Sequence, residues 1–215
     1  MAVTELACLR LRPGQALSPE LLAKLATARS VMEKASGFKF HYYHCLESPE
    51  RVFIIGAWPS IDFHMQDFIP SQANQDLLSL LKDEVAVEWM FHLSFDQTER
   101  SLPLGSAAVA IGRHFIKDDE KRYFQKAFDE NKHYLEDFIG GKELVVGGYR
   151  LDKGFDPSLE AEPDDEFVLF TGWHEVEQHG DFAKTDGFEK YALIRDHLAG
   201  ADIKHAVRLE VDPKA

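Results

Sequence analysis

Two histidines stand at the same distance from a tryptophan in the two halves of the chain. His64 follows Trp58 by six residues, His179 follows Trp173 by six, and the pairs are 115 positions apart. An imidazole exchanges protons near neutral pH, and an indole ring can stack on an aromatic ligand. We therefore predict His64 and His179 as catalytic acid–base groups and Trp58 and Trp173 as substrate-binding groups. In the alternative reading, the histidines only pack and the tryptophans only fill the core.

Three further residues are candidate substrate contacts. Tyr42 and His44 lie two apart in an aromatic-rich segment, where alternate side chains of a strand share a face. Asn131 falls on an otherwise apolar helical stripe, where a buried amide without a partner costs about 1–3 kcal/mol. Asn131 therefore either contacts a ligand or bonds to backbone. We predict no metal site, because His41 and His44 fall on opposite faces of the strand.

The charge of the chain limits its partners. The 215 residues carry a formal net charge of −13, and no basic cluster is longer than Lys121-Arg122. A phosphate backbone or an anionic membrane would be repelled. We find neither a signal peptide nor a membrane span and expect a cytoplasmic protein, in which Cys8 and Cys45 are reduced core thiols.

The chain contains an internal duplication. Residues 51–58 match residues 166–173, and residues 93–96 match residues 209–212 at a shift of 116. We predict a first repeat over residues 1–97, a linker over 98–105 and a second repeat over 106–215. The two repeats would form an internal pseudo-dimer, and a homodimer of the chain is possible in addition.

Each repeat shows the element order βαββαβ. The expected strands are residues 3–11, 38–46, 51–58 and 85–95, then 107–115, 143–151, 166–173 and 203–211. Helices are expected after Ser18, near Ser60, from Asp118 to Phe138, and, broken at Gly180 and Gly187, before the last strand. This order predicts an α+β fold of two ferredoxin-like units. We expect them to pack sheet to sheet as a pseudo-twofold α/β barrel, because each unit leaves one sheet face to be covered.

The stretch from Gly37 to Ser60 carries a family resemblance. A glycine precedes the second strand, an acidic turn follows, and an apolar strand ends in Trp58-Pro-Ser60. This pattern resembles the antibiotic-biosynthesis-monooxygenase (ABM) branch of the dimeric α/β barrel superfamily, and residues 167–179 resemble it more weakly. The resemblance implies a tandem-duplicated member of that branch, with a cleft between sheet and helices.

The resemblance also implies an activity. Members of the branch oxidise aromatic polyketides without a cofactor in a cleft lined by a Trp, a Tyr six residues later and an Asn four residues earlier. Here Trp58 and Trp173 are retained, while the other two positions hold His64 and Ile54, or His179 and Leu169. Haem-degrading relatives have an axial His where this chain has Leu77-Leu78 or Ala192-Leu193, and leucine and alanine cannot ligate iron.

Three functions remain open from the sequence. The first is a cofactor-independent, monooxygenase-like enzyme of secondary metabolism acting on a hydrophobic aromatic or polyketide-like molecule. The second is an acid–base cyclase, dehydratase or decarboxylase that uses His64 in the same cleft. The third is a non-catalytic small-molecule-binding or assembly protein, because fold does not determine function.

Overall fold

The computed structural model describes residues 1–152 and 165–211, which divide into two compact units. The described part of unit 1 comprises residues 1–99, 151–152 and 208–211, and that of unit 2 comprises residues 100–150 and 165–207. Unit 1 thus contains two segments from beyond the predicted first repeat. Residues 153–164, between the expected strands at residues 143–151 and 166–173, lie outside the described residues.

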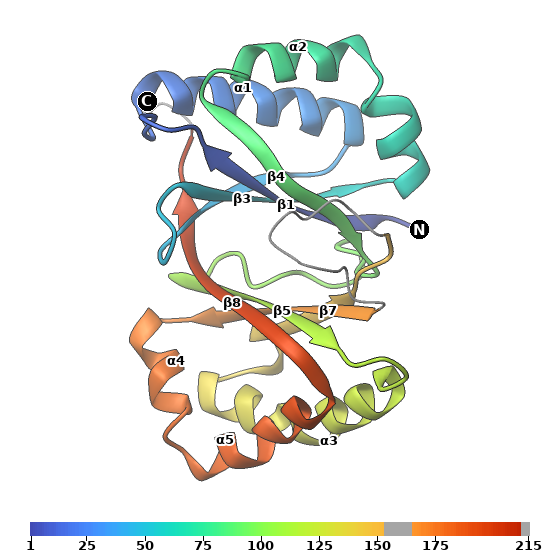
Figure 1. Cartoon of the computed structure of the whole chain (residues 1–215), viewed down its shortest axis with the longest axis vertical. Coiled ribbons are helices and arrows are strands. Elements are labelled where there is room, and N and C mark those ends of the chain that lie inside the picture. Colours follow the sequence, from blue (N-terminus) through green and yellow to red (C-terminus); the bar gives the residue numbers. More distant parts are fainter. Residues whose placement is uncertain (153–164, 212–215) are drawn as a thin grey trace. The chain divides into compact units, whose positions relative to one another are not determined.

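Unit 1 is a ferredoxin-like βαββαβ fold. Its sheet has the order β4-β1-β3-β2, and every neighbouring pair is antiparallel. Helices α1 and α2 cover one face of this sheet (Figure 1). The elements are β1 (Val3–Leu11), α1 (Pro19–Ser36), β2 (His41–Cys45), β3 (Arg51–Trp58), the π-helix η1 (Phe63–Phe68), α2 (Gln72–Leu81) and β4 (Val85–Leu93).

Unit 2 repeats this topology. Its sheet has the order β8-β5-β7-β6, again antiparallel, with α3, α4 and α5 on one face (Figure 1). The elements are β5 (Ala108–Ile116), α3 (Lys121–Ile139), the 3-10 helix η2 (Lys142–Leu144), β6 (Val145–Tyr149), β7 (Asp165–Trp173), α4 (Val176–Phe182), α5 (Asp186–Tyr191), the 3-10 helix η3 (Ala192–His197) and β8 (Leu198–Leu209). The predicted α+β fold of two ferredoxin-like repeats is confirmed.

Local signals explain where the long helices begin and end. Ser18 caps α1 by accepting a hydrogen bond from the Leu21 amide at 3.3 Å. Gly37 and Gly140 end α1 and α3 in the left-handed region, with φ of 80° and 97°. The buried face of α1, which includes Leu21 and Leu25, packs on Trp58 and the sheet in one apolar cluster. Helix propensity and core packing therefore agree in unit 1.

Several predicted boundaries are wrong in unit 2. Asp118 does not cap α3, which begins at Lys121 after a turn in which Asp119 has a φ of 63°. The break after α4 falls at residues 183–185, where Thr185 caps α5, and neither Gly180 nor Gly187 interrupts a helix. Short polar side chains compete for amides at several neighbouring positions, so tertiary contacts select the cap.

Gly147 lies in β6, where the neighbouring strand leaves no room for a side chain. A Cβ atom at Gly147 would lie 2.6 Å from the Phe167 ring and 2.8 Å from the Val168 carbonyl oxygen. The register of β6 with β7 runs without a shift. Close approach of the neighbouring strand, and not a bulge, therefore requires glycine here.

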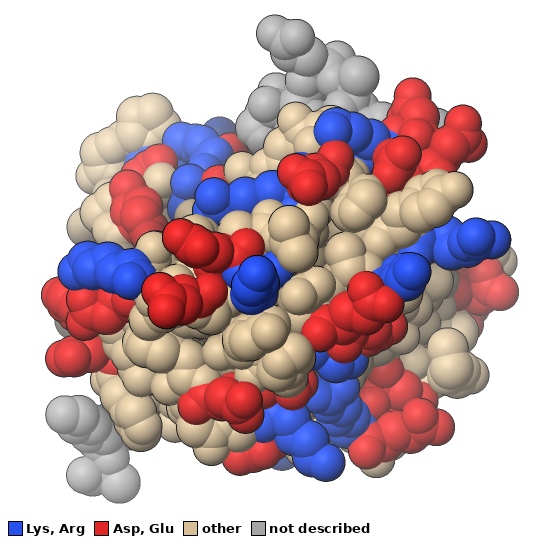
Figure 2. All heavy atoms as spheres, turned by 90° about the horizontal axis from the view of Figure 1, so that it is seen from below, with Lys and Arg blue, Asp and Glu red and all other residues tan. Residues whose placement is uncertain are grey.

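Cys8 and Cys45 are buried free thiols, as predicted. Within the described residues, no helix is long and apolar enough to cross a bilayer. Acidic and basic side chains are interspersed over the face shown in Figure 2.

Candidate functional site

Unit 1 holds a cavity of about 260 Å³ between its sheet and its helices. Most of the lining is apolar, and the polar side chains in it are Glu5, Tyr42, His64 and Asn74. Leu78 and Val87 line the cavity and are 49% and 55% exposed, so the cavity reaches the surface beside them. An apolar cavity with few polar groups is the usual form of a small-molecule site. Its volume lies just below the usual range of about 300–1,000 Å³, which favours a small ligand.

A π-helical turn positions His64 at this cavity. The carbonyl oxygen of His64 accepts the Ile69 amide at 2.9 Å, five residues on, and this widened turn is often found at functional sites. The His64 ring stacks on Trp58, with 4.1 Å between ring centroids and an angle of 9° between planes. Trp58 itself is fully buried and does not line the cavity, so its contact with the His64 ring lies outside the cavity lining.

A second histidine and a carboxylate form a chain of hydrogen bonds with His64. Its Nδ1 lies 2.8 Å from Nε2 of His92 on β4, and Nδ1 of His92 lies 2.7 Å from Oδ2 of Asp152. The His92 amide also donates to Oδ1 of Asp152 at 2.7 Å. A carboxylate only accepts, so the neutral His92 ring carries its proton on Nδ1 and accepts the Nδ1 proton of His64. The Nε2 lone pair of His64 is then the free base. We call these three residues the relay.

The surroundings of His64 keep its ring neutral. Burial is the largest cause that lowers the pKa of His64, to about 3. His64 is 2% exposed, and no described residue gives its Nε2 a hydrogen bond. A proton taken up at Nε2 can be balanced by passing the Nδ1 proton to His92, whose positive charge faces the Asp152 carboxylate. The relay therefore suits general base chemistry in an apolar site.

The lowered pKa predicts a loss of stability in acid. Between the ordinary pKa of 6.5 and the folded value of about 3, the unfolded chain binds a proton at His64 that the folded chain does not. Stability should therefore fall as pH falls through this window, with a slope of about 1.4 kcal/mol per pH unit from this one group. In urea unfolding between pH 7 and 5, His64→Gln should reduce the slope. The exposed His133→Gln should not, and equal slopes in wild type and His64→Gln would contradict the assignment.

Glu5 is the second ionisable group beside His64. Its Oε2 accepts the indole N–H of Trp58 and lies 3.8 Å from Nδ1 of His64. Glu5 is 3% exposed, and burial raises the pKa of its carboxyl group, opposed in part by the Trp58 hydrogen bond. The cavity thus has a neutral base and a carboxyl group biased toward its neutral form.

Unit 2 repeats part of this arrangement. His179 stacks on Trp173, with 4.5 Å between centroids, and its Nδ1 lies 2.7 Å from Nε2 of His205. His205 pairs with Ala110 across the strands, as His92 pairs with Glu5 in unit 1. Unit 2 therefore has alanine in place of the acid, and its cavity at His179 is smaller, about 120 Å³.

The structure separates the other predicted site residues. Tyr42 lines the 260 Å³ cavity, with its hydroxyl donating to the Leu25 carbonyl at 3.1 Å. His44 lies outside it, with Nε2 at 2.8 Å from the Pro49 carbonyl oxygen. Asn131 donates to the Ala127 carbonyl at 2.8 Å, the backbone alternative left open by the sequence. The structure thus brings together Trp58, His64 and Tyr42, but not His44 or Asn131.

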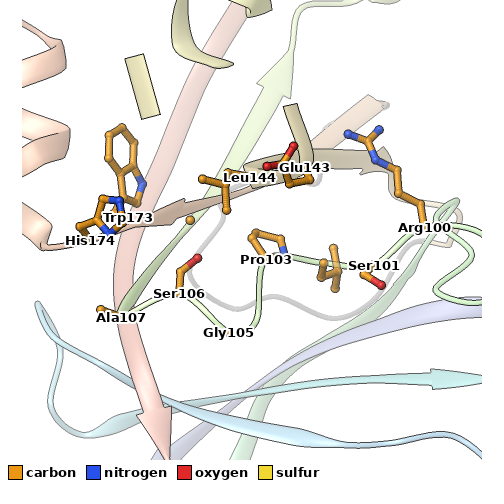
Figure 3. A pocket seen from close by; sticks show the side chains of 12 residues that line it. Arg100, Ser101, Pro103, Gly105, Ser106, Ala107, Glu143, Leu144, Trp173 and His174 are labelled. Atoms are coloured by element: carbon orange, nitrogen blue, oxygen red, sulfur yellow. The ribbon is translucent and has the colours of Figure 1, made fainter. Parts of the chain in front are cut away.

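A larger hollow of about 510 Å³ lies elsewhere in unit 2. Figure 3 shows Arg100 and Glu143 toward one end of it and Trp173 and His174 toward the other. The Arg100 guanidinium donates hydrogen bonds there to the carbonyl oxygens of Lys142 and Val145. The hollow has no buried acid–base pair among its lining residues, so the smaller cavity of unit 1 is the better candidate site.

Known structures share this fold over nearly the whole chain. A "putative chlorite dismutase" has a TM-score of 0.64 at 14% identity, covering 98% of this chain and 95% of its own. An "anthrone oxidase-like protein" has a TM-score of 0.62 at 9% identity, covering 96% and 91%. A "putative monooxygenase" from Lactobacillus acidophilus NCFM has a TM-score of 0.60 at 14% identity, covering 96% and 93%. No family model and no curated protein matches the sequence.

The chain shares with these structures a fold of two ferredoxin-like repeats in one polypeptide. In unit 1, Leu77 and Leu78 line the cavity at the position where the resemblance places an axial histidine in haem-degrading relatives. Among the described residues, no group of three or more His, Cys, Asp or Glu side chains could hold a metal ion. The absence of a metal and a cofactor stays a prediction.

Sequence reasoning missed Glu5, His92 and Asp152. Two signals were readable: Glu5 is the one acidic residue in the apolar segment 3–11, and the last strands of the two repeats carry His92 and His205. Asp152 gave no signal, because it reaches His92 from a segment 60 positions away.

Proposed function

We propose that this protein is an acid–base enzyme that removes a proton from a small hydrophobic molecule, with His64 as the general base. The observation that carries the proposal is the relay from His64 through His92 to Asp152 at the end of an apolar cavity. A histidine that only packs in the core does not require a carboxylate beyond its hydrogen-bond partner. The partner of His64 is a second imidazole ring, which is itself hydrogen-bonded to the Asp152 carboxylate. A positioned base of this kind contributes about 10²–10⁴-fold to a rate.

The proton removed would come from an activated C–H or O–H group, such as the methylene across the central ring from the carbonyl of an anthrone or the hydroxyl of a phenol. Nε2 of His64 takes the proton, and the electron pair of the broken bond moves into the ring system as an enolate or phenolate. In the monooxygenase-like reaction, this electron-rich carbon reduces O₂. Overall a methylene and O₂ give a carbonyl and water. This course requires no cofactor, and the anthrone oxidase-like neighbour motivates anthrone as a probe.

The second candidate keeps the proton transfer but uses no oxygen. Ile54 and Leu169 stand where the related monooxygenases have an Asn, so this chain lacks a side-chain amide at that position to bind a peroxide. Ile54 lines the cavity directly. This favours a cyclisation, dehydration or decarboxylation in which His64 removes a proton and returns it. Both candidates begin with the same step at His64.

The test separates these reactions on one protein sample. With anthrone, oxygen uptake and anthraquinone formation are measured with and without enzyme. With 2-tetralone in D₂O under nitrogen, deuterium exchange at C1 is followed by NMR. We expect accelerated exchange in either case. Oxygen uptake equal to the anthrone consumed would establish the monooxygenase-like reaction, exchange alone would favour the acid–base candidate, and neither would overturn the proposal.

A further inference from the structure

Glu5 has no structural need for its charge. Unit 2 builds the same strand with Ala110 at the corresponding position, and there the indole N–H of Trp173 donates to the Thr171 hydroxyl at 2.8 Å. A neutral hydroxyl thus satisfies the tryptophan in one repeat, while a carboxyl group does so in the other. Burying a carboxyl group costs free energy unless it gains something in return. The fold alone therefore does not account for Glu5.

The geometry of Glu5 leaves one oxygen for a ligand. Oε2 is occupied by the Trp58 indole N–H, whereas Oε1 has no hydrogen-bond partner among the described residues. If the carboxyl group is protonated, its proton sits on Oε1, because Oε2 accepts from Trp58. Glu5 lines the same cavity as His64. A ligand in this cavity therefore meets a hydrogen-bond donor and a base close together.

The charged and titratable groups around Glu5 are His64, His92, Asp152 and Tyr42. Burial is the largest cause that raises the pKa of Glu5, and the Asp152 carboxylate adds to it. The largest opposing cause is the Trp58 hydrogen bond. A carboxylic acid kept neutral by an apolar site can donate a strong hydrogen bond to an oxygen on which negative charge develops.

We propose that Glu5 is a neutral acid that donates a hydrogen bond from Oε1 to the carbonyl oxygen of the substrate, so that the site selects ketones with an acidic C–H beside the carbonyl. This inference rests on the proposed function, because it places the carbonyl at Glu5 and the C–H at His64. In the reaction, His64 removes the proton, the C–H electron pair forms the enolate double bond, and the oxygen that gains the negative charge is held by the Glu5 hydroxyl. The proton on Glu5 is shared and does not leave.

The first test compares ketones with hydrocarbons of the same shape. Dissociation constants are measured calorimetrically for 2-indanone against indane, 2-tetralone against tetralin, and phenylacetone against propylbenzene. We expect at least one ketone to bind about tenfold more tightly than its hydrocarbon, equivalent to about 1.4 kcal/mol. Glu5→Leu should abolish this preference, and Glu5→Gln, which retains a donor, should retain part of it. The absence of a ketone preference in all three pairs would overturn the inference.

A second measurement detects the proposed hydrogen bond to the carbonyl oxygen directly. The carbonyl stretch of bound, ¹³C-labelled 2-tetralone should shift to lower frequency than in water, and the shift should disappear in Glu5→Leu and persist in His64→Gln. An unshifted carbonyl in wild-type protein would contradict the inference. The two proposals also fail separately. If the wild-type protein accelerated exchange but showed no ketone preference, the role of Glu5 would be contradicted and that of His64 would stand. If it preferred ketones but did not accelerate exchange, the proposed function would be contradicted and a ketone-binding site would stand.

Discussion

His64→Gln is expected to slow the enzyme-catalysed deuterium exchange of 2-tetralone by about 10²-fold or more, because glutamine keeps a polar side chain but cannot cycle a proton. The exchange rate is read by NMR at fixed ligand occupancy. His64 is also packed on Trp58, so some loss of stability, about 1–3 kcal/mol, should accompany the change. The decisive comparison is the rate per folded molecule, with the folded fraction taken from unfolding curves.

The duplication supplies the control. His179→Gln removes the matching ring from unit 2, where the stack on Trp173 and the bond to His205 are retained but alanine replaces the acid. We expect the exchange rate to stay within about twofold of wild type in this variant, well inside the expected effect of a positioned base. Equal losses in both variants would place working sites in both units. Full activity in His64→Gln would remove His64 as the base.

Asp152→Asn is expected to lower the exchange rate by about 10–10²-fold, with less effect on ligand affinity. The carboxylate fixes the Nδ1–H form of His92 and stabilises the positive charge that the relay passes to it. An amide can present its NH₂ group to Nδ1, which favours the other tautomer, and it carries no charge. His92 Nε2 would then carry a proton and could no longer accept from His64.

Asp96→Asn is a matched control for this variant, because Asp96 also lies in unit 1 but its carboxylate accepts from Thr98 and from the Ala2 backbone and not from His92. Both variants lose one negative charge, so a general electrostatic effect would appear in both. A rate in Asp152→Asn equal to that of Asp96→Asn would show that the relay ends at His92.

Much of the fold was readable because its signals are periodic and local. The strands at residues 3–11 and 51–58 and the helix from Pro19 were placed from alternation, a serine cap and a closing glycine. Unit 2 was predicted less well, because Asp118, Gly180 and Gly187 offer starts and stops that the packed structure does not use. The face-to-face packing of the two sheets stays a prediction.

The candidate site divides in the same way. The repeated Trp and His spacing singled out Trp58 and His64, and the aromatic strand singled out Tyr42; the structure brings all three together. His44 and Asn131 were equally reasonable by residue type, but their side chains bond to nearby carbonyl oxygens. Residue type indicates that a polar group needs a partner, and only the packed chain decides whether that partner is backbone or ligand.

By itself, the sequence determined the duplication, the ferredoxin-like order of elements and the placement of a histidine beside the last residue of a central strand in each repeat, because these follow from local periodicity and from self-similarity. Only the tertiary structure decided what His64 can do. Glu5 comes from the first strand, His92 from the fourth, and Asp152 from a segment beyond the predicted first repeat. Their approach depends on strand register and on long-range contacts, which no local pattern encodes, and it makes the two repeated histidines chemically different.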